Sequence, residues 1–219
     1  LADYIGHRHI LGDGMPLAVA IAQKKPFSRL RWGPPGCGKT TLALLLADAF
    51  DARYIRLSAV FSGVKEVREA VAQAQQERAI GRKTILFIDE IHRFSKSQQD
   101  SLLAAVEQGI VTLIGATTEN PSFEVIRPLL SRCQVYTLGP LSTEEIIGLL
   151  QHAITTDELL SQRRIVLTET AALLRYAGGD ARRALNILEL VALSTTSDPL
   201  LVTDELVSQR VQTNPLAFD

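Results

Sequence analysis

Hydrophobic positions alternate between two periods up to about Leu138. Short apolar runs rich in β-branched residues are typical of strands that are covered on both faces, and they occur at 54–57, 84–88, 111–114 and 134–138. Apolar residues at intervals of three to four positions predict helices, and such stretches occur at 16–22, 41–50, 64–78 and 98–108. Strands that alternate with helices predict an α/β fold, a three-layer domain built on a parallel sheet.

Local signals predict one further strand and both ends of one helix. Segment 29–32 is predicted to be a further strand because it directly precedes a glycine-rich loop, although Arg29 and Arg31 are unusual in a buried parallel strand. Ser97 is the expected N-cap of the helix at 98–108, and Gly109 is its expected end. Nothing in the sequence accounts for Arg31.

The pattern changes after Gly139-Pro140, where the strands stop. Helical periods then recur at 144–153, 169–177, 180–194 and 203–211. We therefore expect two domains, an α/β domain over 1–139 and a small all-helical domain over 140–212. The remaining residues, 213–219, are expected to begin a linker.

Composition adds little to this picture but excludes some classes. Of 219 residues 46% are apolar, so a sizeable core can be buried. With 23 Lys and Arg against 24 Asp and Glu, the net charge of -1 neither demands nor excludes nucleic acid as a partner. Cys37 and Cys133 are far apart and suggest a reduced, intracellular protein. No apolar run reaches membrane-spanning length, and the start at Leu1 suggests a fragment of a longer protein.

The segment from Gly33 to Thr40, GPPGCGKT, fits the phosphate-binding pattern G-x-x-x-x-G-K-[ST]. Its glycines let backbone N–H groups point at phosphate oxygens, Lys39 adds a positive charge, and the Thr40 hydroxyl can bind Mg²⁺. A glycine-rich turn without a ligand could give the same pattern, but the helix predicted at 41–50 would face the phosphates with its positive end. The predicted nucleotide-binding residues are Gly33, Pro34, Pro35, Gly36, Cys37, Gly38, Lys39, Thr40 and Thr41.

Asp89 and Glu90 directly follow the apolar run 84–88. Ligands of open parallel sheets bind at the carboxyl ends of the strands, so both carboxylates are expected beside the phosphates. Asp89 would hold Mg²⁺, and Glu90 would orient and deprotonate an attacking water. The simpler interpretation is an acidic surface turn.

Three further signals are weak on their own. Residues 115–120, GATTEN, follow a predicted strand and could position water, but an ordinary turn explains them equally well. Nothing local distinguishes Arg132 from a solvated surface charge. Asp180 is a natural N-cap, and Arg182 then falls in the first helical turn, where the dipole disfavours a cation. That placement indicates an anionic partner, although Arg183 could take either role.

Taken in order, the segments GPPGCGKT, ILFIDE, GATTEN, LLSRC and GGDARRALN resemble AAA+ ATPases of the clamp-loader group. The segments SGVKE, DEIHRF, KSQQD and GATTENPSF are similar to those of the replication-associated recombination protein A family, also called MgsA. The resemblance covers nearly the whole chain. It implies a P-loop AAA+ fold in which the helical domain is a lid over the nucleotide.

The resemblance also implies roles for individual residues. Thr118 matches the sensor-1 position, and Arg182 matches sensor 2. Arg132 matches the arginine finger, which acts on ATP held by a neighbouring subunit. Tyr4 and Ile5 match a stretch that packs on adenine.

By the same resemblance, we expect a DNA-dependent ATPase that uses ATP and Mg²⁺ in replication-fork maintenance, recombination and repair. Expected partners are DNA forks, gaps or single-strand/double-strand junctions, further copies of the full-length chain, single-strand binding protein and other replication proteins. A cytoplasmic, nucleoid-associated bacterial protein is implied, without a membrane. Two alternatives stay open, a nucleotide-binding scaffold that does not hydrolyse ATP and a Holliday-junction branch-migration motor.

Overall fold

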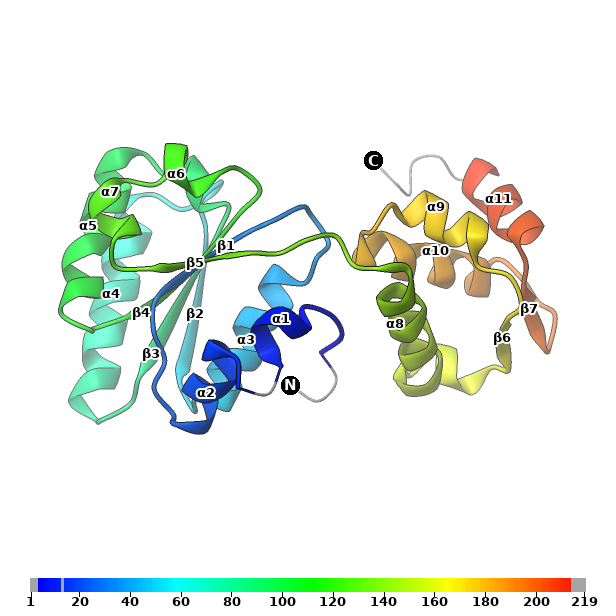
Figure 1. Cartoon of the computed structure of the whole chain (residues 1–219), viewed down its shortest axis with the longest axis horizontal. Coiled ribbons are helices and arrows are strands. Elements are labelled where there is room, and N and C mark those ends of the chain that lie inside the picture. Colours follow the sequence, from blue (N-terminus) through cyan, green and yellow to red (C-terminus); the bar gives the residue numbers. More distant parts are fainter. Residues whose placement is uncertain (1–3, 13, 214–219) are drawn as a thin grey trace. The chain divides into compact units, whose positions relative to one another are not determined.

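The computed structural model describes residues 4–12 and 14–213, with Arg8 described by its backbone alone, and it divides into two compact units (Figure 1). The first unit extends to Gly139, except that Pro35–Cys37 group with the second unit, which begins at Pro140. In the part of the chain that is described, no helix is long and apolar enough to cross a membrane.

A five-stranded parallel sheet forms the centre of the first unit and confirms the predicted α/β fold. The strand order is β2-β3-β4-β1-β5. Because β1 lies between β4 and β5, the loop that follows it leaves from the interior of the sheet. The strands are β1 (Arg29–Trp32), β2 (Arg53–Ser58), β3 (Thr84–Asp89), β4 (Thr112–Thr117) and β5 (Gln134–Thr137).

Helices cover both faces of this sheet, which makes the three expected layers. Figure 1 shows α4 (Val64–Ala79) and α5 (Lys96–Glu107) on one face and α3 (Lys39–Ala49) on the other. Leu86 and Ile88 of β3 pack into the core that α4 and α5 close. The apolar run of β3 is fully buried because both of its faces are covered. Shorter helices are α1 (Arg8–Leu11), α2 (Pro16–Ala22), η1 (Ile91–Arg93), α6 (Pro121–Glu124) and α7 (Arg127–Leu130).

Helix α5 begins two residues earlier than predicted, because its N-cap is Ser95 rather than Ser97. The Ser95 hydroxyl accepts a hydrogen bond from Gln98 N at 3.3 Å, and Gln98 Oε1 accepts one from Ser95 N at 2.8 Å. This reciprocal pair satisfies two backbone donors that the helix would leave open. Ser97 cannot be the cap because it already lies inside the first turn of α5.

The arginines of β1 are buried, and each has a backbone partner. Arg31 Nη1 donates to the carbonyl oxygen of Lys39 at 2.5 Å, so it ties β1 to the first residue of α3 across the glycine-rich loop. Arg29 Nε donates to Phe27 O at 3.1 Å, and its guanidinium lies 4.2 Å from the centre of the Phe27 ring. Burial lowers the pKa of Arg29 to about 10. The structure thus accounts for Arg31 as a brace for the start of α3.

The second unit is mostly helical and has its own core, formed by Leu150, Leu173, Leu188 and Val191 among others. The prediction of an all-helical domain is wrong in one respect, since β6 (Ile165–Leu167) and β7 (Leu200–Val202) pair in parallel. The pair forms because Ile165, Leu200 and Val202 are buried in the same core. The helices of the second unit are α8 (Thr143–Thr156), η2 (Leu160–Gln162), α9 (Ala171–Ala177), α10 (Ala181–Leu193) and α11 (Asp204–Thr213). Of the predicted linker, only Thr213 falls within the described residues.

Gly115 in the middle of β4 is required by packing, so Gly115→Ala should destabilise the first unit. A Cβ atom there would lie 2.5 Å from Leu30 Cδ2 and 3.1 Å from Ile91 Cδ1. We expect overpacking to lower the free energy of unfolding by roughly 1–3 kcal/mol, measured by urea denaturation. Gly148→Ala on α8 is the control, because a Cβ at Gly148 meets no atom within 4 Å. Equal stability of Gly115→Ala and the unchanged protein would contradict the packing argument.

Candidate active site

The loop between β1 and α3 has the backbone geometry of a phosphate cradle. Gly36 and Gly38 have φ angles of 67° and 84°, in the left-handed region that side chains other than hydrogen disfavour. The loop ends at the N-terminus of α3, an 11-residue helix. The unsatisfied N–H groups and positive dipole end of such a helix attract anions.

Lys39 places a buried ammonium group at this loop. Its side chain lies within the fold, 8% exposed, and Nζ donates to Gly33 O at 2.8 Å and to Pro34 O at 2.7 Å. Both acceptors belong to the loop itself, so the positive charge is held where phosphate oxygens would accept from it. The loop backbone, the helix end and Lys39 together fit a phosphate group.

The carboxylates predicted after β3 lie at its carboxyl end, next to the end of β2. Asp89 Oδ2 accepts from Arg56 Nη2 at 3.2 Å. Glu90 has φ 53° and ψ 45°, a left-handed conformation that is uncommon for residues other than glycine. Backbone strain of this kind persists only where the surrounding structure holds it, and it concentrates at functional sites.

Two side chains converge on one oxygen of the Glu90 carboxylate. Thr118 Oγ1 donates to Glu90 Oε2 at 3.3 Å, and His92 Nε2 lies 3.3 Å from the same atom. The structure therefore brings together Glu90 and Thr118, which come from different strands. A carboxylate held in this way can accept a proton from water in a fixed direction.

His92 is a site residue that the sequence analysis missed. Its Nδ1 lies 3.0 Å from the Thr117 hydroxyl, which also accepts from Glu119 N at 2.9 Å. With Nε2 facing Glu90 and Nδ1 facing the Thr117 hydroxyl, the His92 ring links the carboxylate to the end of β4. Its position two residues after Glu90 was the available signal in the sequence. The turn at η1, which no sequence pattern indicates, brings the imidazole ring back to the Glu90 carboxylate.

We expect His92→Ala to lower kcat for ATP roughly tenfold with little change in KM, because a loosened Glu90 loses orientation but not substrate contacts. His92→Gln keeps an N–H donor and should recover part of the loss. Steady-state turnover measures both, and His152→Ala on α8 controls for the removal of an imidazole elsewhere. Unchanged kcat in His92→Ala would remove His92 from the site.

The adenine and metal positions stay predictions. Tyr4 Oη lies 3.5 Å from Gly38 O, which places the ring beside the glycine-rich loop, and Ile5 is half-buried next to it in the chain. Within residues 4–12 and 14–213, no group of three or more His, Cys, Asp and Glu side chains could hold a metal ion. Mg²⁺ is commonly held by one or two protein groups together with substrate phosphates, and Thr40 and Asp89 offer that chemistry.

The two predicted arginines lie in different units. Arg132 follows α7, and its Nη2 forms an ion pair with Glu107 at the end of α5, while Nη1 donates to Pro128 O at 2.7 Å. Arg182 is exposed in the first turn of α10, which Asp180 caps by accepting from Arg183 N at 3.0 Å. Their contacts with a nucleotide stay predictions.

Residues 30–141 match the family model described as ATPase family associated with various cellular activities, AAA. The chain is similar to proteins named "Replication-associated recombination protein A". It is 51% identical to that of Haemophilus influenzae over 194 residues and 52% identical to that of Escherichia coli K12 over 195 residues. These matches cover 87% and 88% of this chain but 44% of each relative, so the chain spans less than half of their length.

Among solved structures, the chain resembles one titled Thermotoga maritima RuvB Holliday junction branch migration motor. The TM-score is 0.77 at 25% identity, and the match covers 97% of this chain and 71% of the other.

Proposed function

Because the chain belongs to the AAA family of ATPases, we propose that it hydrolyses ATP in replication-fork maintenance, recombination and repair. The observation that carries the proposal is the Glu90 carboxylate, held by Thr118 and His92 at the carboxyl end of β3. It lies in the same unit as Lys39 and at the sheet edge where ligands of parallel sheets bind.

Each residue of the site has a separate task. Lys39 and the loop N–H groups bind and orient the phosphates, and they neutralise charge on the transferred phosphoryl group. Glu90 accepts the proton of the attacking water, while Thr118 and His92 keep its carboxylate in place. Mg²⁺, when bound by Thr40 and Asp89, supplies further positive charge to the phosphate oxygens.

We further propose that the turnover depends on DNA. The names of the relatives, replication-associated recombination protein and branch migration motor, support DNA forks, gaps or junctions as partners. Subunits would assemble so that Arg132 acts on ATP in a neighbour, with single-strand binding protein as a candidate partner. The bacterial relatives support a location in the cytoplasm, and we propose association with the nucleoid.

The deciding experiment measures phosphate release by the full-length protein with forked, gapped and single-stranded DNA and without DNA. Stimulation by one of these structures is the expected result. A non-hydrolysing scaffold predicts no phosphate release in any mixture, although it would still bind ATP. A branch-migration motor predicts strand exchange on a four-way junction, which the same preparation can be tested for.

Lys39→Ala is expected to weaken ATP binding roughly 10–100-fold, because a charge-assisted hydrogen bond to phosphate contributes about 1.5–3 kcal/mol. Binding of a fluorescent ATP analogue measures the loss. Lys65→Ala on α4 is the matched control, since Lys65 is exposed and its ammonium group lies 3.8 Å from Glu69 on the helix surface. Equal affinity of Lys39→Ala and the unchanged protein would exclude Lys39 from the phosphate site.

A further inference from the structure

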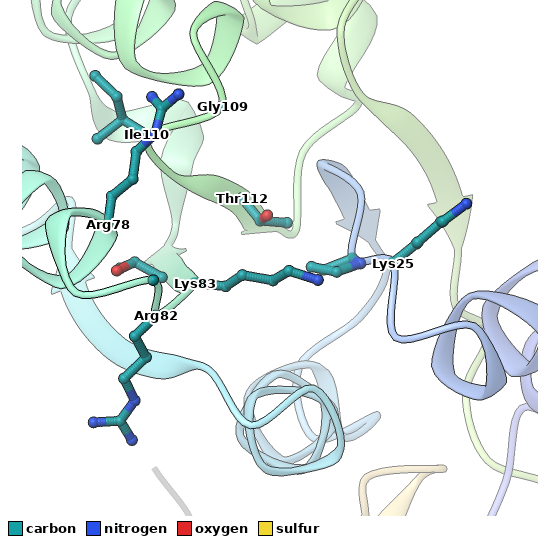
Figure 2. Close-up of a pocket in the computed structure, with 10 residues that line it drawn as sticks. Lys25, Arg78, Arg82, Lys83, Gly109, Ile110 and Thr112 are labelled. Carbon is teal, nitrogen blue, oxygen red and sulfur yellow. The ribbon is translucent and has the colours of Figure 1, made fainter.

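A hollow of about 410 Å³ lies in the first unit, at the amino ends of β3 and β4 (Figure 2). Thr84 and Thr112, the first residues of these strands, line it. The nucleotide loop and Asp89 lie at the carboxyl ends of the strands. Since a strand rises about 3.3 Å per residue, the two ends of β3 are on the order of 17 Å apart, so the hollow is separate from the candidate active site.

Four cations and no carboxylate line this hollow, in a chain whose net charge is -1. They are Lys25, Arg78, Arg82 and Lys83. Figure 2 shows Lys83 lying across the hollow and Arg78 along one side of it, with Lys25 and Arg82 extending outward from its rim. Outside the lining, Glu77 Oε2 lies 3.8 Å from Arg82 Nη1. Because its described lining residues include four cations and no carboxylate, the hollow is strongly positive.

Helix ends account for part of this charge. Helices α4 and α5 both end beside the hollow, and each C-terminus carries about half a negative charge. Arg78 Nη1 donates to Gln108 O, at the C-cap of α5, at 2.9 Å, and Lys83 Nζ donates to Lys24 O at 2.6 Å. Glu77 and the two helix ends offset about two of the four cations. The four cations therefore exceed the negative charge beside them by about two.

A buried hydroxyl in the same hollow also lacks a partner. Thr84 is 2% exposed, and its Oγ1 makes no hydrogen bond within the described residues. Buried polar atoms are normally paired, so an exception needs a partner such as a water molecule or an ion. A hydroxyl that can donate, next to guanidinium and ammonium groups, matches the acceptor-only oxygens of a phosphate.

We propose that this hollow binds a phosphate group. Pro26 and Ile110 are its apolar lining residues, so it offers little apolar surface to a peptide partner. The phosphate can come from a DNA backbone or from a small polyphosphate, and the experiment distinguishes the two sources. The DNA source rests on the function proposed above.

The test compares Lys25→Gln/Arg82→Gln with a control, Arg164→Gln/Arg175→Gln, which removes two exposed charges from the second unit. Fluorescence anisotropy with a labelled oligodeoxythymidylate measures DNA binding. Counterion release makes each phosphate contact worth roughly fivefold in affinity at about 0.1 M salt. Loss of two contacts should therefore weaken binding roughly 25-fold and flatten the salt dependence, while the control changes little.

The second arm measures pyrophosphate binding by calorimetry, with Lys39→Ala present in every protein so that the nucleotide loop contributes less. Lys25→Gln/Arg82→Gln should weaken this binding relative to the control. Thr84→Val, which replaces the unpartnered hydroxyl with a methyl group, should also weaken it several-fold without lowering Tm.

A loss in the oligonucleotide arm identifies a DNA backbone as the source, and a loss in the pyrophosphate arm alone identifies a small polyphosphate. Affinities that match the control in both arms overturn the proposal, as does binding of polyglutamate with no binding of either phosphate probe. With Lys39 intact, Lys25→Gln/Arg82→Gln and Thr84→Val should keep the basal ATP turnover of the unchanged protein. Absence of turnover in the unchanged protein would contradict the proposed function. The two binding experiments would still test phosphate binding by the hollow, because they do not depend on turnover.

Discussion

Glu90→Gln is expected to bind ATP with unchanged affinity and to lower kcat by roughly 10²–10⁴-fold, the usual contribution of a positioned general base. The glutamine side chain keeps the shape of glutamate and can still accept from Thr118 Oγ1. It cannot accept a proton from water. Phosphate release and binding of a fluorescent ATP analogue, measured on the same preparation, separate the two effects.

Glu69→Gln on α4 makes the same change at an exposed carboxylate that pairs with Lys65 and should leave turnover unchanged. Turnover of Glu90→Gln within twofold of the unchanged protein would assign the base to another group. A joint loss of binding and turnover would instead indicate that Glu90 supports the loop.

The second large effect is expected at Arg132, since an arginine finger contributes roughly 10³–10⁵ in kcat. Full-length Arg132→Ala and Glu90→Gln should each be nearly inactive. Mixed oligomers can place an intact Arg132 beside a site that keeps Glu90, so mixing should restore part of the turnover. Subunit exchange must be demonstrated by native mass spectrometry. No recovery in proven mixed oligomers would leave Arg132 as a surface or packing residue.

The ion pair of Arg132 with Glu107 gives this experiment a further arm. Both side chains are about 40% exposed, and such pairs contribute about 0–1 kcal/mol, so release toward a neighbouring subunit costs little. Glu107→Gln should therefore keep the turnover of the unchanged oligomer. A large loss in Glu107→Gln would mean that the pair itself, within one subunit, is what the activity requires.

Much of the first unit could be predicted because its signals are local. The apolar run before Asp89 and the spacing from Gly33 to Thr40 depend on neighbours in sequence. They identified β3, the glycine-rich loop and the two carboxylates at the end of β3. Arg31 shows the limit of this reasoning, since its acceptor, Lys39 O, is a backbone atom that no sequence pattern indicates.

The features that were missed depend on contacts distant in sequence or on turn geometry. The triplets 165–167 and 200–202 become strands only because they pair with each other in the second core. His92 joins the site because Glu90 adopts a left-handed backbone, which turns the chain back on itself. A stretch of three residues carries too little periodicity to reveal either feature.

The position of β1 between β4 and β5 also sets an order of events during translation. The strand before the glycine-rich loop leaves the ribosome first, ending at Trp32, yet its partners begin only at Thr112 and Gln134. The nascent chain can pair β2 with β3 while β1 still lacks both neighbours. Non-local parallel pairing of this kind forms slowly. A growing chain therefore cannot place the loop after β1 beside Glu90 before β4 and Thr118 have emerged.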